Sequence, residues 1–186
     1  IMLIPLTLIV YTINLVSGDH GPLFYSQERI GKNGKHFKMY KFRSMVVGAD
    51  EKLKEILKSD PELRAEFMRD RKLKNDPRIT RAGKFLRKTS LDEFPQFINV
   101  IKGEMSLVGP RAVIDGEIEK FGTKKNVVLS VKPGITGYWA ANGRSDTTYE
   151  ERVEMETYYV KNSNVVFDFK ILFKTVMVVI KHEGAV

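Results

Sequence analysis

The chain has 186 residues and a formal net charge of +8 at pH 7, with 42% hydrophobic and 29% charged residues. This length favours one ordinary domain with a buried core, and the composition excludes a disordered chain and a polytopic membrane protein. The positive charge suits a polyanionic partner, such as a nucleic acid, an anionic membrane or a phosphate-rich substrate. Because there is no cysteine, disulfides, thiolate nucleophiles and cysteine-containing zinc sites are excluded. The three histidines lie far apart in the sequence, so any bound metal is expected to be a hard cation held by oxygen, namely Mg²⁺.

The N-terminal segment is mostly apolar, and its first charged residue is Asp19. A helix from Met2 to Val16 would be about 22 Å long at 1.5 Å per residue, shorter than a hydrocarbon core of about 30 Å. Pro5 is expected to interrupt this helix near its start. We therefore expect the segment to be embedded in a membrane without clearly spanning it, with a buried core helix as the alternative. The chain starts at Ile1 rather than Met, so we also expect it to be part of a longer protein.

Residues 23–45 read as two short β-like runs around a Gly-Lys-Asn-Gly turn. In the second run aromatic residues alternate with basic ones, including Lys41 and Arg43. Such a pattern occurs in proteins that bind single-stranded nucleic acid. It is equally the pattern of a plain half-buried strand, or of a strand that lies near lipid headgroups or over a nucleotide. The sequence alone leaves these interpretations open.

The next part of the chain is expected to be helical. A first helix covers residues 50–58, and a second begins after Asp60 as N-cap, with Pro61 at its first position. Thr80 is expected to cap a short third helix that extends through Arg87.

Asp92 and Glu93 are adjacent carboxylates in an otherwise basic chain. Ser90 and Glu93 match the S-x-x-E capping box, which gives Glu93 a purely structural interpretation at the start of a helix. Pro95 moves the start of the regular helix towards itself, and Gly103 is expected to end it. Two adjacent acids are also what a site for a divalent cation and a phosphoryl group requires, so both interpretations stand.

In the C-terminal half, residues 114–121 are expected to form a short helix and residues 126–131 a strand. Thr147 and Glu150 match a second capping box at the start of a longer helix. Asp168 is expected to cap the last helix, whose lysines gather on one side of an otherwise apolar surface. Such a helix suits a membrane interface, and packing on the protein core is the alternative.

Three arginines adjoin turns or helix ends: Arg87, Arg111 and Arg144. The planar guanidinium group suits phosphate oxygens, which it binds through two parallel hydrogen bonds. The sequence contains neither a Walker A motif nor a GxGxxG motif, so an ordinary nucleotide hydrolase or a Rossmann domain has no support.

Three long stretches carry a resemblance to a known family. They read "GPLFYSQERIGKNGKHFKMYKFRSM", "DPRITRAGKFLRKTSLDEFPQFINVIKGEMSLVGPR" and "VKPGITGYWAANGR". With them the chain resembles the bacterial sugar transferases, which are monotopic phosphoglycosyl transferases acting on polyprenol phosphate. The C-terminal "DFKILFKTVMVVIKHEGA" is similar to the ending of the undecaprenyl-phosphate hexose phosphotransferases.

The resemblance implies transfer of a sugar 1-phosphate, expected to be a hexose, from a UDP-sugar to undecaprenyl phosphate with release of UMP. This is the first membrane step of exopolysaccharide, capsule or O-antigen synthesis. Asp92 would be the nucleophile that forms an aspartyl-phosphosugar intermediate, and Glu93 would assist the second half-reaction. Mg²⁺ would bridge Asp92 and the diphosphate of the donor.

The resemblance also assigns substrate- and phosphate-binding positions, which fall on Arg87, Arg111 and Arg144, with Lys41 as a weaker candidate. Pro5 matches the proline at which the membrane helix of the family breaks and turns back. Many members carry serine before this proline, whereas this chain has Ile4.

The expected fold is therefore α/β (α+β), a compact mixed domain of short helices and few strands with interfacial amphipathic helices. Residues 1–18 would form a re-entrant membrane helix truncated at its start. Residues 19–186 would form a catalytic domain on the cytoplasmic face of the bacterial inner membrane. The expected partners are a UDP-sugar, undecaprenyl phosphate and membrane lipids, without nucleic acid, and a homodimer stays open. The ending favours galactose or glucose, and the alternative function is a non-catalytic basic module that binds membranes or nucleic acid.

Overall fold

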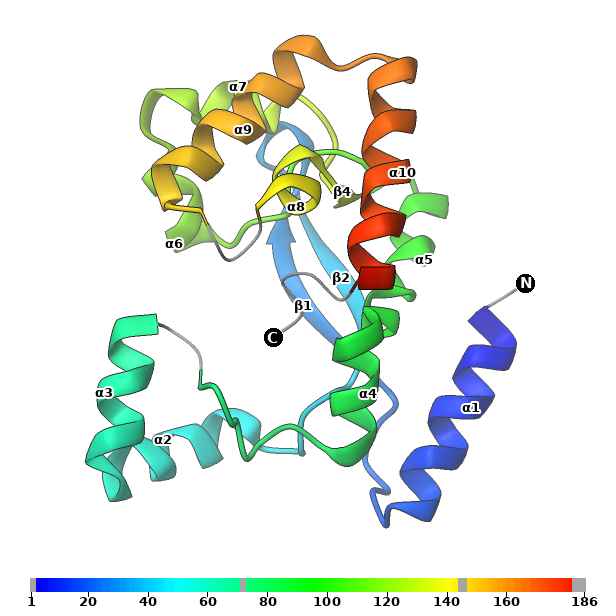
Figure 1. The fold of residues 1–186 in the computed structure, drawn as a ribbon, viewed down its shortest axis with the longest axis vertical. Helices are drawn as coiled ribbons and strands as arrows, with labels where there is room; N and C mark the ends of the chain where they lie inside the picture. The colour runs from blue at the N-terminus through cyan, green and yellow to red at the C-terminus, as the bar shows by residue number, and fades with distance from the viewer. Residues whose placement is uncertain (1–2, 71–72, 144–146, 182–186) are drawn as a thin grey trace. The chain divides into compact units, whose positions relative to one another are not determined.

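The computed structural model describes residues 3–70, 73–143 and 147–181 (Figure 1). Helices predominate over a few short strands, which confirms the expected α+β class. The chain divides into two compact units. The first contains the residues up to Phe24 together with Phe42–Asp92, and the second contains Tyr25–Lys41 and the residues from Glu93 onward.

The first unit is helical. Asp60 and Thr80 cap α3 and α4 as expected, because their side-chain oxygens accept hydrogen bonds from backbone N–H groups of the first turn. Its helices are α1 (Leu3–Val16), α2 (Ala49–Ser59), α3 (Pro61–Asp70) and α4 (Arg81–Thr89).

Helix α1 packs against α4, and it buries the side chains of Val10 and Asn14. Most of its other large apolar side chains are exposed, so the alternative of a buried core helix is wrong for most of its surface. Pro5 lies in the first described turn, where a proline is tolerated, and the expected break in the helix stays a prediction. Among the described residues, no helix combines the length and the apolar character needed to cross a membrane.

Helix α4 is fixed to the segment that follows β2 through Ser44. The carbonyl oxygen of Ser44 accepts a hydrogen bond from the Thr80 N–H at 3.1 Å. Gly83 faces the same carbonyl so closely that a Cβ atom at this position would overlap it. One turn further on, the Arg87 Nε donates to the Ser44 Oγ at 3.0 Å.

The described residues of the second unit form a β-hairpin, a two-stranded parallel sheet and the α-helices α5 to α10. Strands β1 (Phe24–Ile30) and β2 (His36–Phe42) form the hairpin, and their ends Phe24 and Phe42 belong to the first unit. Strand β3 (Ser106–Val108) pairs in parallel with β4 (Gly134–Thr136). The helices are α5 (Gln96–Ile101), α6 (Asp115–Ile118), α7 (Lys125–Leu129), α8 (Tyr138–Asn142), α9 (Tyr149–Asn162) and α10 (Val165–Lys181).

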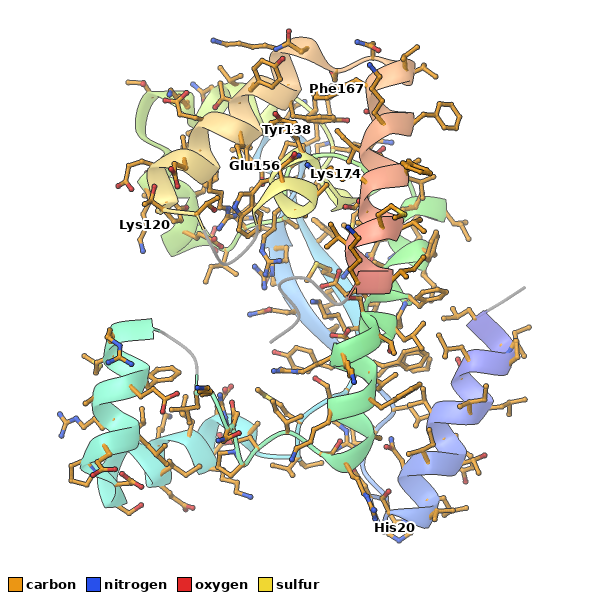
Figure 2. The ribbon with its side chains drawn as sticks, viewed as in Figure 1. His20, Lys120, Tyr138, Glu156, Phe167 and Lys174 are labelled. Carbon is orange, nitrogen blue, oxygen red and sulfur yellow. The ribbon has the colours of Figure 1, made fainter. Side chains whose placement is uncertain are left out.

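Helix α8 lies between α9 and α10 (Figure 1). Tyr138 of α8 and Phe167 of α10, both labelled in Figure 2, contact each other with their ring centroids 5.4 Å apart. Beneath them Tyr159 and Ile171 are buried with Val108 of β3. Helix α10 therefore packs one side on the core, as one of the two alternatives predicted.

The aromatic and basic run in β2 is a half-buried strand. Phe37, Met39 and Phe42 are buried. The Arg43 that follows is buried as well, and it donates to the Asp19 carboxylate at 2.7 Å. This hydrogen bond holds the pKa of Asp19 below its ordinary value of 3.8. The run therefore does not present a row of solvent-facing aromatic rings for stacking bases.

Three local expectations are wrong. Residues 126–131 do not form a strand, because α7 begins at Lys125 and packs against α9, where the tertiary contacts outweigh the β-propensity of two valines. The capping box of α9 lies one residue later than expected, at Thr148 and Glu151. Helix α10 begins before Asp168, and the Asn164 side chain accepts the hydrogen bond from the Phe167 N–H.

The contact between Gly83 and Ser44 generates the first prediction. Replacing Gly83 with alanine raises helix propensity by about 1 kcal/mol. We nevertheless expect Gly83→Ala to lower the free energy of unfolding by about 1–3 kcal/mol, because the new methyl group meets the Ser44 backbone and not a mobile side chain. Urea denaturation monitored by circular dichroism measures the difference.

Gly116 of α6 supplies the matched control, because a Cβ atom there has no neighbour within 4 Å. Gly116→Ala should leave the stability unchanged or slightly raised. Equal stability of the Gly83→Ala variant and the original chain would contradict the close packing of α4 on Ser44.

Candidate active site

The two adjacent acids lie in a 3₁₀ turn, Leu91–Glu93, directly after α4. Ser90 ends α4 in the left-handed conformation, with φ 55° and ψ 18°. An N-cap residue has extended backbone angles, so the expected capping box at Ser90 and Glu93 is wrong. Asp92 is the last residue of the first unit and Glu93 the first residue of the second.

Glu93 forms an ion pair with Lys41 of β2, and 2.7 Å separates the Glu93 Oε1 from the Lys41 Nζ. Both side chains are partly buried, at 30% and 23% exposure respectively. Lys41 was expected to bind substrate, and the structure places its ammonium group on one of the two acids instead. An ion pair of this kind fixes the orientation of the Glu93 carboxylate.

The fully buried Asn99 of α5 holds this helix on β2. Its Oδ1 accepts a hydrogen bond from the Tyr40 N–H at 3.1 Å, and its Nδ2 donates to the Lys38 carbonyl at 2.7 Å. The Nδ2 also donates to Glu104 at 2.7 Å. Because Tyr40 precedes Lys41 in β2, this asparagine sets the distance between the strand and the turn that carries Glu93.

In the first unit, Arg87 is anchored by the Ser44 hydroxyl and lies near a second pair of charges. Asp76 and Arg78 are both buried and joined by hydrogen bonds at 2.7–3.2 Å. Burial alone raises the pKa of Asp76, but the Arg78 hydrogen bonds and the charges of Arg78 and Arg87 hold it below its ordinary value of 3.8. The sequence analysis did not single out this pair.

Arg111 follows a turn in which backbone packs directly on backbone. A Cβ atom at Gly109 would lie 2.6 Å from the Lys132 carbonyl oxygen, and Cβ atoms at Gly134 and Gly137 would overlap the Gly109 backbone. The absence of side chains lets the Gly109 N–H reach the Thr136 carbonyl at 2.9 Å. The Gly134 N–H likewise donates to the Pro110 carbonyl at 2.9 Å. The turn is therefore held on the β4 side by hydrogen bonds of the main chain.

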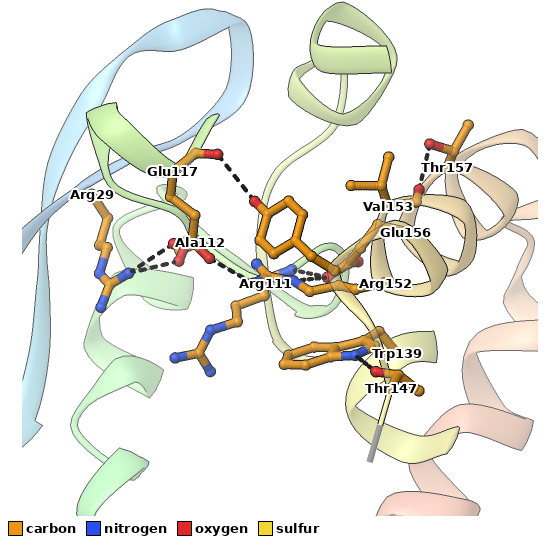
Figure 3. A network of polar contacts seen from close by, with 11 residues as sticks. Arg29, Arg111, Ala112, Glu117, Trp139, Thr147, Arg152, Val153, Glu156 and Thr157 are labelled. Atoms are coloured by element: carbon orange, nitrogen blue, oxygen red, sulfur yellow. Dashed lines mark hydrogen bonds and ion pairs between the residues drawn. The ribbon is translucent and has the colours of Figure 1, made fainter. Parts of the chain in front are cut away.

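The backbone N–H of Arg111 donates to the Oε1 of Glu156 at 3.0 Å (Figure 3). The guanidinium group of Arg111 lies 5.9 Å from the ring centroid of Trp139, and the residue is exposed. The Trp139 Nε1 in turn donates to the Thr147 Oγ1 at 2.8 Å. An arginine placed over an aromatic face and open to solvent is suited to bind a phosphate group.

A network of buried and partly buried charges supports this turn (Figure 3). Arg152 of α9 donates to the Glu117 Oε1 at 2.5 Å and lies over the Trp139 ring at 4.6 Å. Arg29 of β1 donates to the Ala112 carbonyl at 3.2 Å, and 3.9 Å separates it from Glu117. Burial and the charge of Arg111 lower the pKa of Arg29. Arg29, Glu117 and Arg152 were not singled out from the sequence.

Glu156 is 1% exposed, and burial raises its pKa to about 7. The Arg111 N–H and the charges of Arg152 and Arg111 oppose this shift, while Glu117 adds to it. Arg152 and Glu156 are four residues apart, which places both on one side of α9. This spacing is the one signal in the sequence that could have identified these two residues.

Of the other expected site residues, Arg144 lies outside the described part of the chain. Within that part, no three His, Asp or Glu side chains come together in a cluster that could hold a metal ion. A magnesium ion in a phosphoryl-transfer site is usually held by one or two carboxylates and by substrate phosphates. A magnesium site at Asp92 therefore stays a prediction, with the substrate phosphates as the other expected ligands.

Helix α10 leaves a broad apolar surface uncovered. Phe169 and Phe173 are 67% and 71% exposed, and Val165, Val166 and Ile180 are also exposed. The exposed lysines Lys170, Lys174 and Lys181 lie on the same helix. This arrangement of apolar and basic side chains is typical of a helix at a membrane interface.

The sequence was also compared with protein families and with known proteins. A model of the family described as "Bacterial sugar transferase" matches residues 1–182. The chain is 53% identical over 177 residues to the UDP-galactose-lipid carrier transferase of Erwinia amylovora, covering 95% of the chain and 37% of that protein. It is 50% identical over 185 residues to the undecaprenyl-phosphate galactose phosphotransferase of Salmonella typhimurium, covering 100% of the chain and 39% of that protein.

A shorter relative is the exopolysaccharide production protein ExoY of Sinorhizobium fredii, which is 44% identical over 185 residues, with 100% of the chain and 81% of the relative covered. The chain thus spans less than two fifths of the Erwinia and Salmonella proteins and most of this one. The chain belongs to the bacterial sugar transferase family.

Proposed function

We propose that this chain transfers a hexose 1-phosphate from a UDP-hexose to undecaprenyl phosphate and releases UMP. The names of the Erwinia and Salmonella relatives favour galactose as the sugar. The name of the Sinorhizobium relative favours exopolysaccharide synthesis as the pathway. The observation that carries the proposal is the acidic pair of Asp92 and Glu93 in the turn after α4, where an ion pair with Lys41 orients Glu93.

In the first half-reaction, an Oδ atom of Asp92 attacks the β-phosphorus of the donor. A bond forms between this oxygen and phosphorus, and the bond from phosphorus to the oxygen that bridges the two phosphates breaks. UMP leaves with that oxygen, and the hexose phosphate stays on Asp92 as an acyl phosphate. A carboxylate is a weak nucleophile, so the reaction depends on positioning and on neutralising the charge of the phosphates.

In the second half-reaction, a phosphate oxygen of the lipid attacks the same phosphorus and releases the Asp92 carboxylate. Glu93 is the residue next to the reacting atoms, and its ion pair with Lys41 at 2.7 Å fixes its orientation. We assign it the task of accepting a proton from the lipid phosphate or of positioning that phosphate. Lys41 then acts through Glu93.

Magnesium would be held by Asp92 together with the donor diphosphate, where it supplies positive charge at the reacting phosphorus. Arg87 and Arg111 would neutralise further phosphate oxygens. Ser44 orients the guanidinium group of Arg87, and Trp139 lies beneath that of Arg111. Arg144 remains a third candidate for this role.

The lipid acceptor requires contact with a membrane. We assign this contact to the exposed apolar side chains of α1 and α10, with the lysines of α10 at the level of the headgroups. We also assign the chain to the inner membrane, as part of the proposal that undecaprenyl phosphate is the acceptor. The division into residues 1–18 in the membrane and 19–186 outside it, with Pro5 at the break, is part of the same proposal.

We predict that Asp92→Asn blocks the first half-reaction and that Glu93→Gln slows the second. With Mg²⁺ and UDP-galactose but no lipid, intact mass spectrometry should show a hexose-phosphate adduct on the original chain and on Glu93→Gln, and none on Asp92→Asn. When undecaprenyl phosphate is added, Glu93→Gln should transfer about 10²–10⁴ times more slowly, because it lacks a proton acceptor. Asp92→Asn should lose at least about 10³-fold in rate, because no other group replaces the nucleophile.

Asp115 provides the matched control, because it is exposed and pairs with His36. Asp115→Asn should form the adduct normally. Adduct formation by Asp92→Asn, or UMP release on adding lipid without any adduct on the original chain, would show that Asp92 is not the nucleophile. UDP-glucose in a parallel sample tests the choice of sugar.

The membrane contact of α10 is predicted to be local and apolar. The absence of cysteine allows one fluorophore to be attached to Phe173→Cys and another to the exposed Lys161→Cys of α9. With phosphatidylglycerol vesicles, the label at position 173 should shift to the blue and be quenched by brominated lipid. This quenching should persist at about 1 M NaCl, where the Debye length is only about 3 Å.

The label at position 161 serves as the control and should remain in water. Equal quenching at both positions would contradict an orientation set by α10. Quenching at position 173 that disappears at high salt would show that the contact is electrostatic and that the phenylalanine side chains do not enter the lipid.

A further inference from the structure

We infer that Glu156 is a positioning residue for Arg111, holding the backbone of the turn that carries this arginine so that its guanidinium group meets the diphosphate of the donor. The inference rests on the proposed function for the identity of the ligand. The contact itself is given by the structure, because the Glu156 Oε1 accepts the Arg111 N–H at 3.0 Å. Glu156 acts through Arg111 and touches no reacting atom.

The environment of Glu156 is unfavourable for a carboxylate that only fills space. The side chain is 1% exposed, and its Oε2 has no hydrogen-bond partner among the described residues. Burying a carboxylate with unsatisfied oxygens is costly, and an apolar side chain of similar volume often replaces a buried charge without loss of stability. The residue is therefore better explained by the hydrogen bond that it accepts than by its packing.

Arg152 does not account for Glu156 either. Its Nε lies 4.0 Å from the Glu156 Oε1, beyond hydrogen-bond distance. Arg152 instead donates to Glu117 at 2.5 Å and lies over the rings of Trp139 and Tyr149. Within the described chain, the short contact of Glu156 is the one with the Arg111 amide.

The other hydrogen bonds of the turn hold the residues before Arg111, and the Glu156 contact holds the backbone of Arg111 itself. Gly109 and Pro110 are fixed to Thr136 and Gly134 through their own backbone groups. The Arg111 N–H is the next donor along the chain, and Glu156 supplies its acceptor from α9. The side chain of Arg111 is thereby left to solvent above Trp139, with its backbone held in place.

A double-mutant cycle tests whether Glu156 acts through Arg111. Four variants are compared with the full chain in nanodiscs: Arg111→Ala, Glu156→Leu, the two combined, and Glu156→Gln. The Kd for UDP is measured by calorimetry, and KM and kcat for the UDP-hexose in the transfer assay. Arg111→Ala and Glu156→Leu should each raise the Kd and the KM about 10- to 100-fold, as expected for loss of a hydrogen bond to a charged group.

Two outcomes are expected only if Glu156 acts by positioning Arg111. The combined variant should bind UDP no more weakly than the weaker of the two single variants, because both remove the same interaction. Glu156→Gln should stay within about threefold of the original chain, because its amide oxygen still accepts the Arg111 N–H. Additive losses in the combined variant, or a Glu156→Gln variant as impaired as Glu156→Leu, would overturn the inference.

The readouts separate this inference from the proposed function. If the original chain binds UDP but transfers no sugar phosphate, the proposed function fails and the Kd values still decide the role of Glu156. If it transfers and the cycle is additive, the inference alone fails. Should Glu156→Leu not fold, Glu156→Asp takes its place, because a side chain shorter by one methylene withdraws the acceptor.

Thermal unfolding gives a further prediction for Glu156. The pKa is 4.5 in an unfolded chain and about 7 in the folded one, so between these values the folded protein binds more protons than the unfolded one. Stability conferred by the neutral carboxyl group is therefore lost as the pH rises through this window. The charged groups around it are Arg111, Arg152 and Glu117, and the phenols of Tyr149 and Tyr159 are the neighbouring neutral groups.

Glu156→Gln cannot lose a proton, so its Tm relative to that of the original chain should rise from pH 4.5 to pH 7 and level off above. Differential scanning calorimetry of both proteins in the same buffers measures this difference. A difference in Tm that does not change with pH would mean that Glu156 does not titrate in this range.

Discussion

The site in the second unit depends on one constraint, which is the direct approach of two backbones at Gly109, Gly134 and Gly137. Because none of these residues has a side chain, the turn that precedes Arg111 lies directly on the segment that contains β4. The N–H and carbonyl groups of both segments then satisfy each other. A methyl group at any of the three positions would separate the segments and move Arg111 away from Trp139 and Glu156.

Around this turn, Arg152 and Glu156 are buried, and Arg29 and Glu117 are partly buried. Arg29, Arg152, Glu117 and Glu156 come from β1, α9 and α6, which are distant in the sequence. Buried ion pairs contribute little net stability, because desolvation offsets their attraction. The main effect of these ion pairs is on the positions of the elements that carry them. Each pair requires a particular spacing between elements, so the network fixes α9 relative to the turn and gives Arg111 a rigid base.

The sequence was sufficient for much of the fold and for part of the site. The caps at Asp60 and Thr80 were identified because a cap depends on a few neighbouring residues. The strand expected at residues 126–131 and the cap expected at Asp168 were wrong because these segments are decided by contacts with α9 and with Tyr159. Arg152 and Glu156 were missed because, read alone, charged residues four apart on a helix look like an ordinary exposed pair.

For Asp92 and Glu93, the sequence allowed both a helix-capping role and a role in an active site, and the structure was needed to compare them. The sequence allowed a capping box, which would have made Glu93 a structural residue with no further task. The left-handed conformation of Ser90 removes that interpretation, and the ion pair with Lys41 replaces it. A cap satisfies backbone N–H groups and leaves the carboxylate no freedom to meet a ligand. The Glu93 carboxylate is instead paired with Lys41 from the side, and Asp92 lies next to it along the chain. Adjacent acids repel each other, so their proximity is stabilised when a cation or a neutralised phosphate lies between them and solvent.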